Sequence, residues 1–214
     1  LSYSELLQKH PERKEEMIQA LSRNAGRLQR LTDDILDVTR IESETLMLRI
    51  ERLNIRDLIS NIIEDYRNQI EKNNDYVELY HYKPENNDDS IIVEADRARL
   101  FQVISNLLDN AVKFTNKQYN KRGSIDVNVE KKNKNGNKKQ EVIVAIIDNG
   151  TGIDPEIMPR LFTRFATKSE TGTGLGLFVC KGIIEAHGGR IWAENNSDGK
   201  GATFSFSIPL AMEV

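Results

Sequence analysis

Three residues suited to binding a ligand, Asp148, Gly150 and Gly152, directly follow an apolar, β-branched segment at residues 142–147. Such a segment is typical of a buried strand. An ionised carboxylate at a strand end can accept hydrogen bonds from an amino group, and a flat group can approach a glycine because it has no Cβ. The same residues also fit an ordinary turn after a strand, so the choice between a ligand site and a turn depends on the other segments.

Two asparagines and a lysine share one face of a helix predicted over residues 96–115. Asn106 and Asn110 are one helical turn apart, and Lys113 follows three residues later. The amide oxygen of Asn is a ligand for a hard cation such as Mg²⁺, which shares the phosphates of its substrate. Lysine brings a positive charge to the same phosphates. Taken alone, the three residues are more simply the polar outer face of an amphipathic helix.

A third segment, Gly172-Thr173-Gly174-Leu175-Gly176-Leu177, opens the last predicted helix. Glycines at a helix N-terminus expose backbone N–H groups and the positive end of the helix dipole, which suits an anion. The segment is neither a Walker A loop nor a dinucleotide-binding fingerprint, because the required lysine and glycine spacing are absent. Together the strand-end carboxylate, the Asn/Asn/Lys face and this glycine-rich turn predict a pocket for a nucleoside triphosphate.

Composition narrows the classes of protein that remain. The chain has 214 residues, is 38% hydrophobic and carries a net charge of −3. We therefore expect neither a nucleic-acid surface nor direct membrane contact. The single cysteine, Cys180, excludes an internal disulfide and fits a reducing, cytoplasmic compartment. No apolar run reaches the ~20 residues that cross a bilayer, and no signal peptide is recognised at the start. Because the chain opens without Met inside a helical pattern, we interpret it as a piece of a longer protein.

Residues 1–47 have the pattern of a helical hairpin, with helices predicted over 1–8 and 11–46. The longer helix has two apolar series with heptad spacing, and a face this wide is typical of a helical bundle. Two helices cannot bury it alone, so we expect the hairpin to dimerise into a four-helix bundle. Packing of the helix on the following domain is the alternative. The two series are Leu21, Leu28 and Ile35, and Met17, Leu31 and Val38.

From residue 48 the pattern changes to mixed helices and strands. Strands are predicted at 48–51, 76–80, 91–93, 124–131, 141–147, 190–194 and 202–209. Helices are predicted over 58–70, 96–115 and 175–187, with a short one after Asp154-Pro155. Lysine-rich residues 132–139 fit a solvated hairpin tip. This order predicts an α+β fold, a two-layer α/β sandwich with helices on one face of a mixed sheet.

Four segments in this order resemble the N, G1, F and G2 boxes of the two-component sensor histidine kinases. They are Asn106–Phe114, Asp148–Ile153, Leu161–Phe165 and Gly172–Leu177, and with the helical hairpin the resemblance covers nearly the whole chain. It implies a Bergerat-type ATP-binding fold. Residues 1–47 would be part of the dimerisation hairpin, and residues 48–214 would be the catalytic ATP-binding domain.

The resemblance also implies roles for individual residues. Asp148 would bind the adenine amino group, with Gly150 and Gly152 shaping the base pocket. Asn110 would ligate Mg²⁺, while Asn106 and Lys113 would act on the phosphates. Phe162 and Phe165 would anchor a lid that closes over the nucleotide through Gly172, Gly174, Leu175 and Gly176. Lys168 and Arg164 would reach the γ-phosphate from the lid, and Thr203 would make a second contact on the adenine side.

The implied reaction transfers the γ-phosphoryl group of ATP to a histidine on the hairpin, and then to an aspartate of a response-regulator receiver domain. One feature departs from the family: the His-Glu/Asp…Pro box of the acceptor helix is absent. His10 precedes Pro11 in the hairpin loop, His81 lies at a strand end, and His187 belongs to a helix stop. We therefore expect the acceptor histidine upstream of Leu1, and a chain that binds ATP without phosphorylating itself.

Two other functions compete with this one. A related ATPase of the same fold would need a glutamate as general base where the chain has Asn106, and an amide cannot take a proton from water. A dimerising scaffold with a vestigial nucleotide site would not bind ATP.

Overall fold

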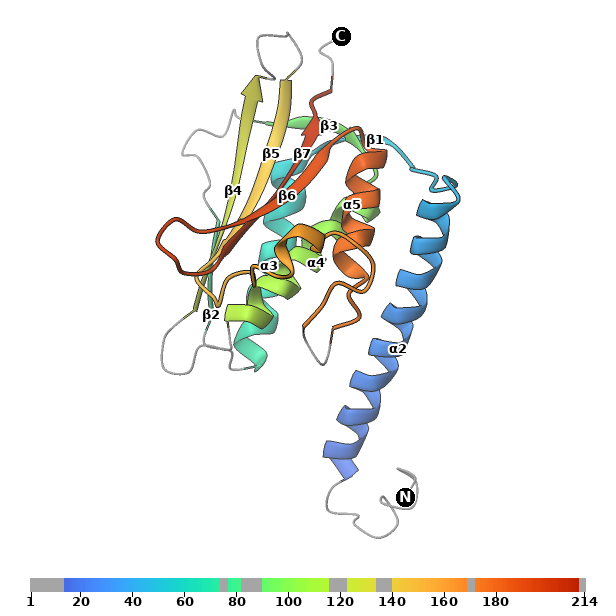
Figure 1. Cartoon of the computed structure of the whole chain (residues 1–214), viewed down its shortest axis with the longest axis vertical. Coiled ribbons are helices and arrows are strands. Elements are labelled where there is room, and N and C mark those ends of the chain that lie inside the picture. Colours follow the sequence, from blue (N-terminus) through green and yellow to red (C-terminus); the bar gives the residue numbers. More distant parts are fainter. Residues whose placement is uncertain are drawn as a thin grey trace.

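The computed structural model describes residues 14–73, 77–81, 90–115, 123–133, 140–168 and 172–211. The predicted helix 1–8 and most of the predicted tip 132–139 lie outside them. The described elements, in chain order, are α2 (Lys14–Glu42), β1 (Glu51–Asn54), α3 (Ile55–Asn73), β2 (Val77–His81), β3 (Ile92–Ala95), α4 (Arg97–Thr115), β4 (Gly123–Asn133), β5 (Gln140–Asp148), the 3-10 helix η2 (Met158–Arg160), α5 (Gly176–Ala186), β6 (Arg190–Asn195) and β7 (Ala202–Pro209) (Figure 1).

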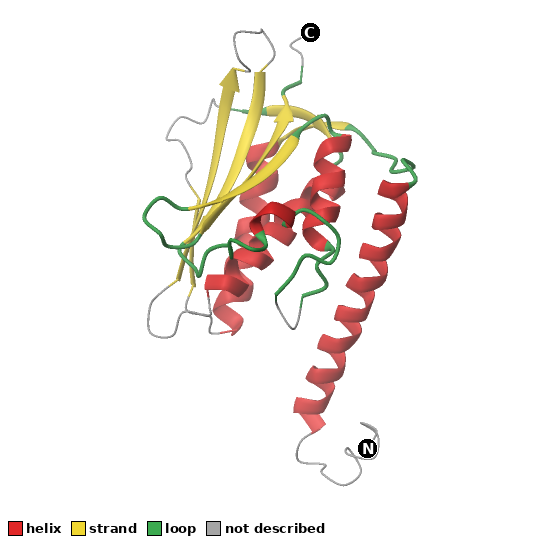
Figure 2. Ribbon diagram, viewed as in Figure 1, coloured by secondary structure: helices red, strands yellow, loops and turns green. Residues whose placement is uncertain are grey.

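The main sheet has five strands in the order β2-β4-β5-β7-β6. The pair β2–β4 is parallel and the other pairs are antiparallel, so the predicted mixed sheet is confirmed. Helices α3, α4 and α5 lie together on one face of the sheet (Figure 2). This two-layer arrangement brings the end of β5 and the middle of α4 to the same side of the molecule.

The core lies between the sheet and these helices. Along β5 the side chains of Val142, Val144 and Ile146 alternate toward the helices, and each is at most 1% exposed. They belong to the same buried cluster as Leu107 and Leu108 of α4, which are fully buried. The apolar face of α4 is thus committed to the sheet, and its polar face is left for other contacts.

A strand predicted at residues 48–51 is wrong by three residues. Strand β1 begins at Glu51 and pairs with β3 in a separate two-stranded sheet. Leu53 is the residue that reaches the core, whereas Ile50 is 52% exposed. The backbone N–H of Arg49 donates to Asp96 Oδ2 at 2.8 Å instead of to a neighbouring strand. Residues 48–51 alternate apolar and polar, whereas the observed strand, Glu51–Asn54, contains a single apolar residue, so periodicity favours the wrong window.

Helix α2 ends earlier than the predicted residue 46, and the predicted helix after Asp154 is mostly a turn. Glu44 has a φ of 56°, a left-handed conformation that ends α2 at Glu42. Asp154 Oδ1 accepts a hydrogen bond from the Glu156 N–H at 2.8 Å, so Asp154 caps the turn at 155–157. Only Met158–Arg160 are helical, as a 3-10 turn. Within the described residues, no helix is long and apolar enough to span a membrane.

The two apolar series of α2 have different environments. Leu21, Leu28 and Ile35 are 40%, 66% and 56% exposed. On the other series, Val38 packs against the core of the following domain, as does Ile41. Helix α2 therefore packs beside α5 through one face, and its second apolar face is covered by no other described part of the chain.

Candidate functional site

A cavity of about 1050 Å³ lies where the polar face of α4, the end of β5 and the segment before α5 meet. Helix α2 closes one side of it. The cavity contains both charged and apolar lining, as a nucleotide requires. Of the residues predicted to bind a nucleotide, those that line it are Asn106, Asn110, Lys113, Asp148, Gly152, Lys168, Gly172, Gly174 and Gly176.

Asp148, the last residue of β5, is nearly buried at 4% exposure. Its Oδ1 accepts hydrogen bonds from the backbone N–H groups of Gly150 at 2.8 Å and Ala202 at 3.4 Å. Burial raises the pKa of this carboxyl, and the two N–H donors only partly oppose the rise. The carboxyl is thus held in place at the cavity wall by backbone groups.

The turn after Asp148 leaves no room for a side chain at Gly150. A Cβ at Gly150 would lie 2.8 Å from both Asp148 Oδ1 and the Phe114 carbonyl oxygen. Gly150 is therefore needed for packing, and it does not belong to the cavity lining. Gly152 lines the cavity and has a φ of +73°, a conformation that favours glycine.

Asn195, the last residue of β6, and Asn196, which follows it, hold this turn, and no pattern in the sequence predicts this role. Asn195 accepts from the Ile153 N–H at 2.6 Å and donates to the Ile153 carbonyl at 3.0 Å. Asn196 Nδ2 donates to the Asp148 carbonyl at 2.8 Å, and its Oδ1 accepts from Thr203 Oγ1 at 2.7 Å. Thr203 lies outside the cavity lining, bonded to the residue that holds Asp148.

The predicted face of α4 opens on the cavity. Asn106 Nδ2 donates to Cys180 Sγ of α5 at 3.7 Å. Lys113 lies 5.6 Å from the centre of the Phe114 ring. The Asn110 amide has no hydrogen bond to other described residues, and it lines the cavity one turn from Asn106. Two amides and one ammonium group thus lie on the same wall.

The F and G2 segments are joined to each other. The Phe165 N–H donates to the Gly174 carbonyl at 2.9 Å, and a Cβ at Gly174 would lie 2.6 Å from the Phe165 carbonyl carbon. Phe165 is 70% exposed, whereas Phe162 packs against the core. Leu175 is buried and directly precedes α5. Neither phenylalanine nor Leu175 lines the cavity.

The two lid cations have partners within the chain. Lys168 Nζ lies 2.7 Å from carboxylate oxygens of both Asp154 and Glu156. Arg164 forms an ion pair with Glu42 at the end of α2. Lys168 lines the cavity, and Arg164 does not.

Among the described side chains, that of His187 does not line the cavity. His187 Nε2 accepts a hydrogen bond from the Asp96 N–H at 3.0 Å, and Nδ1 lies 2.8 Å from the Ile183 carbonyl, to which it donates. This ring joins the end of α5 to the start of α4. His81 is the last residue of β2, and His10 lies outside the described residues.

Helix α2 supplies a wall that the sequence did not reveal. The α2 residues Asn24, Arg30, Leu31 and Asp34 line the cavity. The heptad pattern marks only the apolar side of this helix, so it contains no signal for which polar residues face the neighbouring domain.

The fold is that of a known ATPase class. Residues 95–212 match the family "Histidine kinase-, DNA gyrase B-, and HSP90-like ATPase", and residues 1–44 match the "His Kinase A (phospho-acceptor) domain". The chain belongs to the sensor histidine kinases within this class.

Individual relatives agree with this assignment. The sensor protein KdpD of Clostridium acetobutylicum is 34% identical over 203 residues, which are 92% of this chain and 21% of that protein. The chain spans between about a fifth and a third of the curated relatives it matches. The structure of full-length ShkA in complex with AMPPNP has a TM-score of 0.73 and 25% identity, over 94% of this chain and 40% of ShkA. The histidine kinase ThkA in complex with the response regulator TrrA has a TM-score of 0.65 and 27% identity, over 98% and 57%.

Proposed function

We propose that the chain binds Mg-ATP in this cavity and transfers the γ-phosphoryl group to a histidine of a dimerisation helix. The observation that carries the proposal is that Asp148 and Asn110, 38 positions apart in the sequence, line the same cavity. A carboxylate that accepts from an amino group suits adenine, and an amide beside an ammonium group suits phosphate with a hard cation. The solved complex of ShkA with AMPPNP supports a nucleotide in a relative.

The adenine would lie at the Asp148 end of the cavity. The carboxyl uses Oδ1 for Gly150 and Ala202, and its second oxygen has no hydrogen bond to the described residues. That oxygen can accept from the exocyclic amino group of adenine. Gly152 allows the base to approach the backbone, since no Cβ intervenes.

The phosphates would lie along the polar face of α4. The Asn110 amide is not engaged by other described residues and can offer its oxygen to Mg²⁺. Bound Mg²⁺ would neutralise charge on the β- and γ-phosphates. Asn106 and Lys113 would hold the phosphates, and the glycine-rich start of α5 would offer N–H groups to them. Lys168 would reach the γ-phosphate after exchanging its carboxylate partners for phosphate.

Such a site accelerates transfer by positioning and by neutralising charge. No covalent work by the protein is required. The acceptor would be a histidine that is not in this chain, because the His-Glu/Asp…Pro box is absent from it and His187 is engaged between α4 and α5. On this proposal the chain binds ATP and does not phosphorylate itself. A cytoplasmic location is expected from the single buried thiol.

Two partners are proposed: a second copy of the hairpin and a response-regulator receiver domain. The exposed series of α2, Leu21, Leu28 and Ile35, suits a second copy of the hairpin in a four-helix bundle. The complex of ThkA with TrrA supports a response-regulator receiver domain as the final phosphoryl acceptor.

The decisive experiment is a titration of the chain with ATP, in the presence and the absence of Mg²⁺. We expect binding that Mg²⁺ strengthens. A longer protein that includes the upstream helix should then form acid-labile, alkali-stable phosphate. If ATP did not bind, the chain would instead be a dimerising scaffold. Brisk steady-state hydrolysis without a histidine acceptor would instead indicate an ATPase. We do not expect it, because Asn106 cannot act as a general base.

A further inference from the structure

Helix α2 belongs to the predicted dimerisation hairpin, yet it forms one wall of the nucleotide cavity. Of the α2 residues in the lining, Arg30 and Asp34 are charged and lie one helical turn apart. They line the same cavity as the asparagines and lysine of α4. If α2 moved away from the domain, the cavity would be open on this side.

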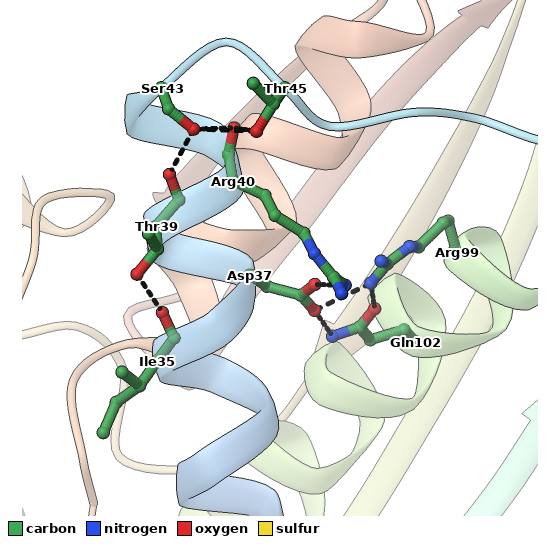
Figure 3. A network of polar contacts seen from close by, with 8 residues as sticks. All are labelled: Ile35, Asp37, Thr39, Arg40, Ser43, Thr45, Arg99 and Gln102. Atoms are coloured by element: carbon green, nitrogen blue, oxygen red, sulfur yellow. Dashed lines mark hydrogen bonds and ion pairs between the residues drawn. The ribbon is translucent and has the colours of Figure 1, made fainter.

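A buried polar cluster fixes α2 against α4. Asp37 of α2 is only 3% exposed. Its Oδ2 accepts from Arg99 Nη1 at 2.7 Å and from Gln102 Nε2 at 2.9 Å, and Arg40 Nη1 lies 3.5 Å from Oδ1 (Figure 3). Arg99 Nη1 also donates to Gln102 Oε1 at 2.9 Å. Gln102 lies one helical turn before Asn106, so the cluster couples α2 to the helix that presents the proposed phosphate ligands.

Close packing next to this cluster fixes the distance between α2 and α5. A Cβ at Gly182 of α5 would lie 2.5 Å from Ile41 Cδ1 of α2, so a larger residue there would displace the Ile41 side chain. Beyond it, Glu42 pairs with Arg164 of the F segment. The C-terminal part of α2 therefore has polar and apolar anchors on the domain.

The charges around the α4 face show what the α2 wall contributes. Lys113 shares this part of the cavity with two carboxylates, Asp34 and Asp109. Arg30 Nη1 lies 3.7 Å from Asp109 Oδ2, and Asp109 directly precedes Asn110. Without Arg30 these groups sum to a negative charge, which would repel a triphosphate. Arg30 brings the sum to neutral, and its guanidinium group can pair with phosphate oxygens.

We infer that Arg30 is a binding residue for the phosphate end of the nucleotide, supplied by α2 and positioned by the Asp37 cluster. The inference rests on the proposed nucleotide function. On this inference, the hairpin and the ATP-binding domain both supply residues that bind the nucleotide.

The test compares ATP with AMP, both with Mg²⁺, by calorimetric titration of the whole chain. Arg30→Ala should weaken ATP binding about threefold to fivefold, the upper range for an exposed ion pair, and change AMP binding less than twofold. Arg30→Lys should restore most of the ATP affinity, because it keeps the charge. Arg97→Ala is the matched control, since Arg97 pairs with Glu51 and is half exposed outside this cavity.

The outcomes separate the inference from the function it rests on. Equal losses for ATP and AMP, or no loss in Arg30→Ala, would overturn the role of Arg30. A wild-type chain that binds neither nucleotide would overturn the proposed function itself.

A double-mutant cycle tests whether Asp37 positions Arg30. Asp37→Ala should reproduce the selective loss of ATP affinity and add little to Arg30→Ala in the double variant. Additive losses would mean that the cluster does not position Arg30. Circular dichroism of each variant confirms the fold, and the Arg30 variants decide the inference if Asp37→Ala fails to fold.

Discussion

Asn106 of α4 and Cys180 of α5 are joined by a hydrogen bond from Nδ2 to Sγ at 3.7 Å, and the thiol itself lies 3.9 Å from the Val103 carbonyl. A Cβ at Gly176, one turn before Cys180, would lie 3.6 Å from the Asn106 amide. The first two turns of α5 therefore enclose one proposed phosphate ligand. With Nδ2 on the sulfur, the amide oxygen is left for the cavity.

Cys180 should be unreactive in the folded protein. Burial raises the pKa of its thiol to about 12, and the bond from Asn106 only partly opposes the rise. At pH 8 the thiolate, which is the nucleophile, is therefore nearly absent. Labelling with a disulfide reagent at pH 8 should be at least about tenfold slower than in the unfolded chain. Equal rates in native buffer and in guanidinium chloride would contradict the described burial.

Asp148→Asn should weaken adenine-nucleotide binding by about 1–3 kcal/mol, since a charged acceptor is replaced by a neutral amide. The fold should survive, because the amide oxygen can still accept from the Gly150 N–H. Titration with Mg-ATP gives the affinity, and urea unfolding gives the stability. Asp65→Asn on α3 is the control, as Asp65 is exposed and does not line the cavity. Unchanged ATP affinity in Asp148→Asn would remove the carboxyl from the base site.

Two glycines of the β6–β7 turn provide a matched pair. Gly199 and Gly201 have φ angles of +72° and +75°, so alanine at either position incurs the left-handed penalty of about 1 kcal/mol. A Cβ at Gly199 meets nothing within 4 Å, whereas one at Gly201 would lie 1.8 Å from the Asp148 carbonyl oxygen. Urea unfolding should therefore give a loss of about 1 kcal/mol for Gly199→Ala, and a loss larger by about 2 kcal/mol or more for Gly201→Ala. Similar losses in both variants would show that the turn relaxes freely away from Asp148.

Local patterns were sufficient to predict the elements that carry the cavity. The apolar run 142–147 lies within β5, and the predicted helix 96–115 differs from α4 by one residue. Both are fixed by short-range periodicity and burial. The helix predicted over 175–187 differs from α5 by one residue at each end, and Gly188, with a φ of +73°, follows its C-cap His187.

Contacts between residues far apart in the sequence could not be predicted from local patterns. Strand β1 pairs with β3, and just before this pair the Arg49 N–H donates to Asp96, 47 residues away. The contact of Asn196 with Asp148 spans 48 residues, and that of Asp37 with Arg99 spans 62. Polar side chains in such contacts have no periodic signal, since their partners are set by tertiary structure. The α2 wall of the cavity was missed for this reason.

Acid should destabilise the protein through Asp96, the residue that precedes α4. Burial alone would raise the pKa of this carboxyl, but the backbone N–H groups of Arg49, Arg99 and Ala98 and the charge of Arg99 outweigh it and lower the pKa. A pKa that is lower in the folded state than in the unfolded state makes the ionised form stabilising above the unfolded value, near 3.9. That contribution is lost as the pH falls through the folded pKa.

Urea unfolding between pH 2 and 7 should therefore show wild-type stability falling below about pH 4. Asp96→Asn should be less stable than the wild type at pH 7, because an amide accepts more weakly from the Arg49 and Arg99 N–H groups. The difference between the two proteins should shrink toward pH 2, where the wild-type carboxyl is neutral as well. A difference that stays constant across this range would mean that the ionisation of Asp96 does not contribute, and that the carboxyl acts only as a neutral cap for α4.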